Sequence, residues 1–212
     1  MALPPGRIAA IHEVRRRRSE TRNVRPRPSP DRHASPDRRT VSSREERKHK
    51  SLQKLFQRYD VNKSGKLEED QVRMLLTDLD NTTPPGTPPT DEELQFVLKV
   101  AAPEGDHCLR FEEIEFAMRS WHIYTGRRRE MEDKILEFDK SGTGTLSWQE
   151  LKALLVALND GNPVENVEVD WVMGEADIFG DGTIHKTELV MACAAWYQHV
   201  EQRQTSRSCA IL

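Results

Sequence analysis

One apolar pattern occurs four times in this chain in the same register, and it limits the possible folds more than any other feature. Counted from anchors at residues 60, 102, 139 and 177, apolar side chains stand eight, five, four and one places before each anchor, seven places after it, and 12, 15, 16 and 19 places after it. Of these 36 positions only Lys134 is not apolar. A chain that is 36% hydrophobic would fill about 13 of them by chance.

The spacing inside each repeat is that of helices. Offsets of three and four residues place side chains on one face of an α-helix. Each repeat is therefore predicted to be an amphipathic helix, a short loop with one buried aliphatic residue, and a second amphipathic helix. Anchors 37 to 42 residues apart indicate stacked units that bury their apolar faces on one another.

The third loop, residues 139–150, has the layout of a cation site. Oxygen-bearing side chains stand at loop positions 1, 3, 5, 7, 9 and 12, namely Asp139, Ser141, Thr143, Thr145, Ser147 and Glu150. A hard cation such as Ca²⁺ takes six or more oxygens, and a bidentate glutamate at position 12 completes the set. Position 7 contributes its backbone carbonyl, and Gly144 at position 6 permits the tight turn. The sequence therefore predicts a calcium site here.

The fourth loop, residues 177–188, repeats this layout less completely. Its predicted ligands are Asp177, Asp181, Thr183 and Glu188, and Gly182 stands at position 6. Phe179 stands at position 3, where a ligand is expected. Loop four therefore has three carboxylates, whereas loop three has two with every other ligand atom in place. Because affinity follows carboxylate count and rigidity, we expect dissociation constants on the order of 10⁻⁶ to 10⁻⁴ M for both.

On these loops and on the four-fold framework, residues 51–200 resemble the EF-hand superfamily, and in particular the four-hand proteins of the calmodulin and troponin-C-like group. The resemblance implies Ca²⁺ as the bound ion. It also implies an all-α fold in two lobes, each a pair of helix-loop-helix hands whose loops pair through short antiparallel strands at position 8.

The first two loops depart further from the pattern. Loop one, residues 60–71, ends in Gln71, which offers one neutral oxygen where a glutamate would offer two charged ones. Weak binding or none is expected from its ligand set, which is Asp60, Asn62, Ser64, Lys66 through its carbonyl, and Glu68. Loop two, residues 102–113, has Ala102 at position 1 and His107 in place of the glycine, so it is predicted to be a silent structural hand.

The first 50 residues differ from the rest of the chain in charge and composition. They hold 15 Lys and Arg against 6 Asp and Glu, whereas the remaining 162 residues have a net charge of −12. With few aromatic residues and many prolines, this basic tail is predicted to be disordered. It suits an anionic lipid surface or an acidic protein surface, or it is simply a solvated tail. No aromatic residues alternate with its arginines, which argues against nucleic acid.

The expected parts of the chain follow from these differences, and the lobe boundary is placed at Gly126, where the apolar pattern stops. The parts are a disordered basic tail (1–50), an amino-terminal pair of hands with degenerate loops (51–125), a calcium-binding pair of hands (126–202) and a flexible tail (203–212). Thr90 and Glu93 form a predicted capping box at the start of the second hand. Asn162 and Pro163 are predicted to cap and start the first helix of the fourth hand.

The last residues, Cys209-Ala210-Ile211-Leu212, match the prenylation box, so Cys209 is a predicted lipidation site. One lipid chain anchors only marginally, and the basic tail would supply a second membrane signal. Three scattered cysteines without a secretory signal indicate a reducing compartment. We therefore expect a cytoplasmic protein, tethered at the periphery of a membrane if Cys209 is modified.

Two function classes remain open. No metalloprotease, nucleophile-elbow or phosphate-cradling motif is present in the sequence, so a binding protein is expected rather than an enzyme. The first reading is a calcium sensor or adaptor that grips a helix or peptide of a partner protein. The alternative is a centrin-like structural or cytoskeletal scaffold with little calcium dependence.

Overall fold

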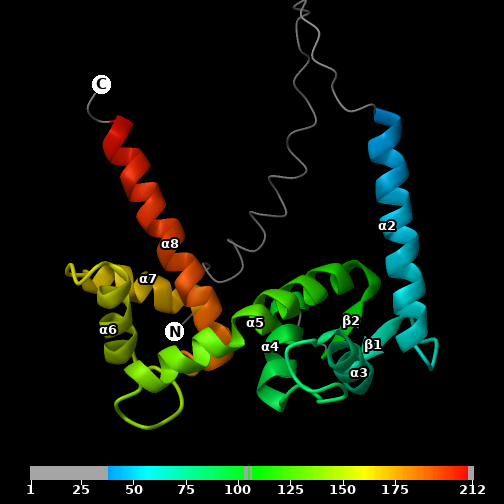
Figure 1. Ribbon diagram of the computed structural model, residues 1–212, viewed down its shortest axis with the longest axis horizontal. Helices are drawn as coiled ribbons and strands as arrows, with labels where there is room; N and C mark the ends of the chain where they lie inside the picture. The colour runs from blue at the N-terminus through cyan, green and yellow to red at the C-terminus, as the bar shows by residue number, and fades with distance from the viewer. Residues whose placement is uncertain (1–37, 103–104, 106, 210–212) are drawn as a thin grey trace, which may run out of the picture.

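The computed structural model describes residues 38–102, 105 and 107–209, which form seven helices and one two-stranded sheet. The elements are α2 (Arg38–Tyr59), β1 (Lys66–Glu68), α3 (Glu69–Leu79), α4 (Asp91–Ala101), β2 (Cys108–Arg110), α5 (Phe111–Phe138), α6 (Trp148–Leu158), α7 (Asn166–Ala176) and α8 (Lys186–Cys209). Figure 1 shows α5 running between two groups of helices, with α2–α4 on one side and α6–α8 on the other. No helix of the described residues is long and apolar enough to cross a membrane.

The repeat predicts the core correctly. Every apolar member of the four-fold pattern is either buried or packed against the buried cluster. The loop aliphatics pair as expected: β1 and β2 are antiparallel with Leu67 opposite Leu109, and Leu146 forms an antiparallel bridge with Ile184. Hydrogen bonds of 2.9 and 2.8 Å join the backbones of Leu146 and Ile184. The predicted all-α fold with strand-paired loops is therefore confirmed.

Three boundaries differ from the predictions. Helix α2 begins at Arg38, so residues 38–50 are helical and not part of a disordered tail, while residues 1–37 lie outside the described residues. Helix α8 continues to Cys209, so residues 203–209 are helical too. Both stretches extend a helix that packs on its lobe, and an established helix adds residues more easily than a new one begins. Helix α5 also has no break at Gly126, so the predicted lobe boundary falls inside it.

Of the two helix starts predicted from the sequence, one is confirmed and the other is wrong. The Thr90–Glu93 capping box is confirmed, with Glu93 N donating to Thr90 Oγ1 at 3.2 Å and Thr90 N to Glu93 Oε2 at 2.9 Å. The predicted start of the fourth hand at Pro163 is wrong, because α7 begins at Asn166. Asn162 instead closes the turn after α6, where its side-chain nitrogen donates to Asn159 O at 2.8 Å.

A buried ion cluster fastens the α3–α4 connection to the middle of α5. Arg128 donates to Asp80 Oδ2 at 2.9 Å and to Glu93 Oε1 at 3.0 Å, and its guanidinium lies 5.5 Å from the ring centre of Tyr124. The Tyr124 hydroxyl donates to the same Glu93 oxygen at 2.8 Å. Because these charged groups are mostly buried but paired, they fix the amino-terminal lobe to α5.

Candidate metal centre

Loop three is built around Asp139, the residue at its first position. The Asp139 carboxylate accepts backbone hydrogen bonds from Gly142, Thr143 and Gly144 at 2.7, 3.1 and 2.7 Å. Gly144 has a φ of 82°, in the left-handed region that glycine adopts without strain. These bonds, led by that of Gly144, lower the pKa of Asp139. The loop is thus wound around an ionised carboxylate.

The neutral ligands of loop three lie next to one another and to Asp139. The Ser141 hydroxyl lies 3.0 Å from Asp139 Oδ1 and 3.2 Å from Thr143 Oγ1. Thr143 Oγ1 in turn lies 3.2 Å from the backbone carbonyl of Thr145. Oxygens of positions 1, 3, 5 and 7 therefore form one continuous row, as the sequence predicts for a hard cation.

Glu150 closes this row from the far end of the loop. Its Oε1 accepts the backbone N–H of Ser141 at 2.9 Å, and its Oε2 accepts the hydroxyl and backbone N–H of Ser147 at 2.6 and 2.8 Å. These bonds, led by the Ser147 hydroxyl, lower the pKa of Glu150 to about 2. The carboxylate is charged, anchored and directed back over the loop, so the residues of loop three fit a calcium ion.

Loop four has the same ends but a different interior. Asp177 accepts from Gly180 N at 2.5 Å and Gly182 N at 3.2 Å. Glu188 accepts from Phe179 N at 2.7 Å and His185 N at 2.9 Å, and no part of it is exposed. Burial of this carboxyl raises the pKa of Glu188 to about 7. The closing glutamate is therefore in place, but its charge is disfavoured.

Both carboxylate oxygens of Asp181, the middle carboxylate of loop four, contact neighbouring side chains. Its Oδ1 accepts the backbone N–H and the hydroxyl of Thr183, both at 2.9 Å, and its Oδ2 lies 2.7 Å from His185 Nε2. In the described part of the chain, no three His, Cys, Asp or Glu side chains are grouped so that they could hold a metal together. Loop four, despite its three carboxylates, does not gather them at one point.

In loop one, side-chain amide groups donate hydrogen bonds to the oxygens of the loop itself. Asp60 accepts from Ser64 N at 2.9 Å and from Gly65 N at 3.0 Å, as a ligand at position 1 should be held. However, the Gln71 amide nitrogen donates to Asn62 Oδ1 at 3.3 Å, and Asn62 donates to Glu68 Oε1 at 3.1 Å. Amide N–H groups point at oxygens that a cation would need, which supports the prediction of weak binding. The remaining predicted ligands lie near them: the Ser64 hydroxyl donates to the Lys66 carbonyl at 2.9 Å.

Loop two supplies a strand. His107 adopts a φ of 49° where glycine stands in the other loops, a left-handed conformation that histidine tolerates better than most residues. The following residues form β2, which pairs with β1. Glu113 accepts the backbone N–H of Arg110 at 2.8 Å, as a cap of α5.

Two contacts of these loops were not predicted from the sequence. Ser147 was predicted only as the oxygen at position 9, and in the structure its hydroxyl and its backbone N–H both donate to the closing Glu150. Glu92 of α4 accepts a hydrogen bond from Thr187 Oγ1 of loop four at 3.1 Å. Glu92 and Thr187 are far apart in the sequence and belong to different lobes, so no local pattern reveals this contact.

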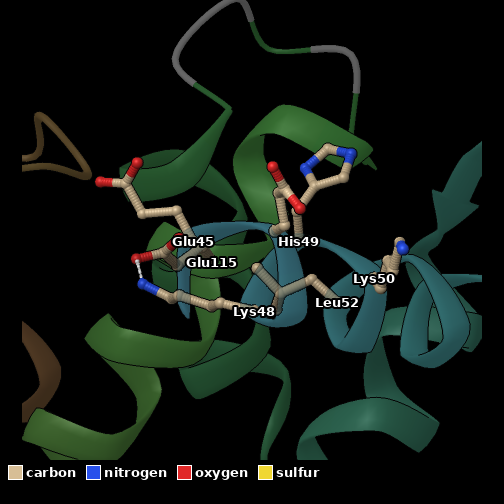
Figure 2. Close-up of a pocket in the computed structure, with 7 residues that line it drawn as sticks. Glu45, Lys48, His49, Lys50, Leu52 and Glu115 are labelled. Atoms are coloured by element: carbon tan, nitrogen blue, oxygen red, sulfur yellow. Dashed lines mark hydrogen bonds and ion pairs between the residues drawn. The ribbon is translucent and has the colours of Figure 1, made fainter. Parts of the chain in front are cut away.

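A separate groove of about 710 Å³ lies between α2 and α5, lined by α2 residues between 45 and 52 and by Glu115 of α5 (Figure 2). Its lining is charged with both signs, and Lys48 Nζ lies 2.6 Å from Glu115 Oε1 across it. His49 meets Phe111 edge to face with ring centres 5.1 Å apart. The groove is where this part of α2 lies on α5, and none of its lining residues belongs to the four loops.

Comparison with known proteins agrees with this architecture. Residues 49–119 match the EF-hand domain pair family. The probable calcium-binding protein CML25 of Arabidopsis thaliana is 27% identical over 135 residues, which are 64% of this chain and 68% of that protein. Calmodulin-like protein 6 of Homo sapiens is 28% identical over 142 residues, 66% of this chain and 74% of that protein. The myosin regulatory light chain of Physarum polycephalum is 30% identical over 140 residues, 66% of this chain and 88% of that protein.

The family model covers the lobe with poorer loops, whereas these relatives each extend over about two thirds of the chain. Four helix-loop-helix units, paired loops and oxygen-lined turns are found together with relatives matched over most of their length. The chain therefore belongs to the EF-hand family, as a calcium-binding protein of the calmodulin type.

Proposed function

We propose that this protein is a calcium sensor that regulates a partner protein through its carboxyl-terminal lobe. The observation that carries the proposal is the position of Glu150, which belongs at once to loop three and to the first turn of α6. A residue that binds in the loop while fixing the start of a helix links occupancy of the loop to the direction of that helix.

The residues around Glu150 link loop three to the packing of α6. Calcium, when bound, would supply a positive charge to the oxygens of loop three. Because Glu150 lies in the first turn of α6, a change in its position on binding would shift α6 relative to α5. Helix α6 buries Leu151, Leu154 and Leu155 against the core of the lobe. Re-angling α6 would uncover part of this apolar face for a partner helix.

The same lobe already presents large apolar side chains to solvent. Trp171 of α7 is 40% exposed and Tyr197 of α8 is 54% exposed. Val167, also on α7, is 65% exposed. Aromatic residues that combine apolar area with a polar edge are typical anchors of protein interfaces, so these exposed residues of α7 and α8 support a protein partner over a small ligand.

The experiment is a calcium titration of the full chain with a dye that fluoresces on apolar surface. The sensor predicts calcium uptake together with dye binding, and loss of most of both responses in Glu150→Gln. Uptake without dye binding would replace the sensor with a constitutive adaptor or buffer. No uptake at millimolar calcium would leave a helical scaffold of the centrin-like kind. Glu112→Gln removes the same charge from an exposed position in α5 and serves as the control.

Membrane attachment through Cys209 is a second, independent proposal that rests on sequence alone. Cys209 is the last residue of α8, and the three residues after it lie outside the described residues. We expect the wild-type chain expressed in a eukaryotic cell to sediment with membranes and Cys209→Ser to remain in the supernatant. Equal partition of the two would remove the proposed tether and leave the calcium sensor unaffected.

A further inference from the structure

Loop four differs from loop three in one further respect: it packs on the other lobe. Glu92, in the first turn of α4, accepts the Thr187 hydroxyl at 3.1 Å, and its other oxygen lies 3.6 Å from His185 Nδ1. Thr187 is fully buried by this packing. At the other end of α4, Lys99 Nζ lies over the Phe179 ring, 5.1 Å from its centre. Two charged residues of the amino-terminal lobe therefore contact three side chains of the fourth calcium loop.

Two of these three side chains stand where ligands are expected. Phe179 is at position 3 and His185 at position 9, and their rings meet edge to face with centres 5.0 Å apart. Between Lys99 and Glu92 they form one continuous contact with α4. Position 3, at which loop four departs from the calcium-loop pattern, is thus one of the positions at which the loop contacts the other lobe.

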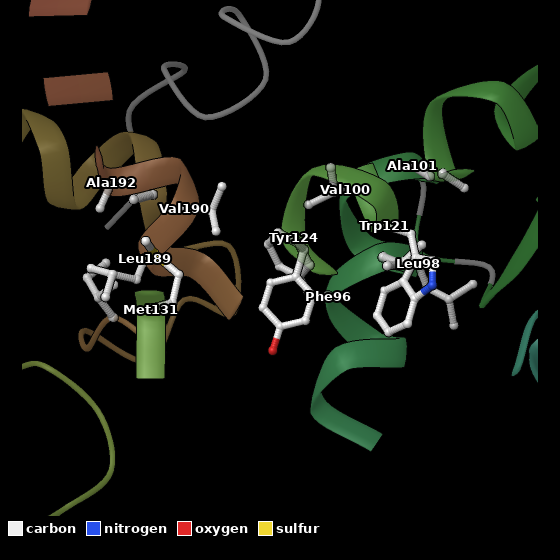
Figure 3. Packing of buried hydrophobic residues seen from close by; sticks show 14 of the residues in the cluster. Phe96, Leu98, Val100, Ala101, Trp121, Tyr124, Met131, Leu189, Val190 and Ala192 are labelled. Atoms are coloured by element: carbon white, nitrogen blue, oxygen red, sulfur yellow. The ribbon is translucent and has the colours of Figure 1, made fainter. Parts of the chain in front are cut away.

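An apolar seam extends the same contact. Helix α4 buries Phe96 and Val100, two residues outside the repeat pattern, in addition to the four positions that the pattern predicts. Val190 of α8, also outside the pattern, is 9% exposed. Figure 3 shows Val190 on the side of its lobe that faces Phe96 and Tyr124, and the buried residues of both lobes form one cluster. A helix that is buried on a second face has a second packing partner.

The contact has a consequence for Asp181. His185 lies between two carboxylates, Glu92 at Nδ1 and Asp181 at Nε2, so Glu92 holds the ring against Asp181. A cation that bound Asp181 Oδ2 would have to approach it to about 2.3–2.6 Å, and His185 Nε2 already lies 2.7 Å from this oxygen. Calcium binding through Asp181 Oδ2 therefore competes with the His185 ring.

We propose that docking of α4 on loop four is a latch that opposes calcium binding at this loop, with Glu92 as the positioning residue that holds His185 on Asp181. The proposal rests on the calcium-binding function above and adds its regulation. Since coupling between two sites is reciprocal, calcium at loop four would in turn weaken the docking of the two lobes. Loop three, whose contacts above lie within its own lobe, would load first, and loop four would load as the latch opens.

The test uses the full chain carrying Glu150→Gln, so that the remaining calcium uptake, measured by calorimetry, reports on loop four. Glu92→Ala is compared with Glu112→Ala, because both glutamates occupy the second position of a helix and carry the same charge. We expect Glu92→Ala to increase the calcium affinity by at least about fivefold and Glu112→Ala to leave it unchanged. Lys99→Met, which loosens the same contact from its other end, should act in the same direction but less.

A second measurement needs no calcium. In chelator, amide hydrogen exchange of residues 177–188 should be faster in Glu92→Ala than in the parent chain and unchanged in Glu112→Ala, because the loop loses its support. The latch is overturned if Glu92→Ala leaves the affinity unchanged or weakens it, or if loop four takes up no calcium in any variant. In the last case, calcium uptake is measured on the chain with Glu150 intact. Uptake by that chain would overturn the latch but retain the proposed sensor, and no uptake would overturn both.

Discussion

Loops three and four lie side by side in one lobe and end in the same residue type, yet their closing glutamates are in opposite states. Glu150 is held by three N–H and O–H donors, which lower its pKa to about 2. Glu188 is fully buried, which raises its pKa to about 7. Counting carboxylates ranks loop four above loop three, whereas geometry ranks loop three first. Surroundings, more than ligand count, decide how ready a loop is for calcium.

The largest expected effect separates the two loops directly. Glu150→Gln should weaken the tighter of the two calcium-binding events by about 100-fold, because a bidentate charged ligand becomes a single neutral oxygen. Glu188→Gln should remove only the weaker event. Calorimetry on each variant measures both. If Glu188→Gln abolished the tighter event instead, the ranking of the loops given above would be reversed.

A gain of binding is predicted for loop one. Asp60 is already held by backbone N–H groups, and Gln71 at position 12 supplies the amide nitrogen that points at Asn62. Gln71→Glu should therefore add a calcium site with a dissociation constant on the order of 10⁻⁴ M. The expected observation is one additional weak binding event by calorimetry.

The matched control for this gain is Gln71→Met, which removes the amide without adding a carboxylate. It should add no site. An equal gain in both variants would mean that the amide donor, and not the missing charge, is what silences loop one.

The smallest effect concerns pH in the metal-free protein. Glu188 has a folded pKa of about 7 against an ordinary value of 4.5, so the folded chain binds more protons than the unfolded chain between these values. Its contribution to stability is thus fully present below about pH 4.5 and is lost as pH rises through about 7. In chelator, the melting temperature of the wild type relative to Glu188→Gln should fall by about 5–10 °C between pH 5 and pH 8.

Glu150 provides the contrast in the same experiment. Its folded pKa is lowered, so its contribution is complete above the ordinary value of 4.5 and is lost only as pH falls toward about 2. The melting temperature relative to Glu150→Gln should therefore be flat between pH 5 and pH 8. Parallel pH profiles for the two variants would contradict the difference between the loops.

The fold was predictable because its determinants are periodic and local. The spacing of apolar residues reports which helix face is buried, and all its apolar members contribute to the core. The position-8 pairs, Leu67 with Leu109 and Leu146 with Ile184, follow from the same register. Helix ends were less predictable: α7 begins after Pro163 and not at it, because Glu165 and Glu168 form the cap that starts the helix.

The candidate site also has one part that was predictable from the sequence and one that was not. The order of oxygens in residues 139–150 specifies a cation loop in isolation, since every ligand comes from twelve consecutive residues. The state of loop four has no such local signature. It depends on Glu92 and Lys99, which the fold brings to loop four from the other lobe.

Local order along the chain was therefore sufficient for the four helix-loop-helix units, their pairing and the ranking of loops one and two below loop three. Tertiary packing alone decided that Glu188 is buried, that His185 lies against Glu92 and that α4 has a second buried face. The physical reason is that helix periodicity and loop ligands are set by neighbours in sequence. Burial and inter-lobe ion pairs depend on residues that become neighbours only after folding.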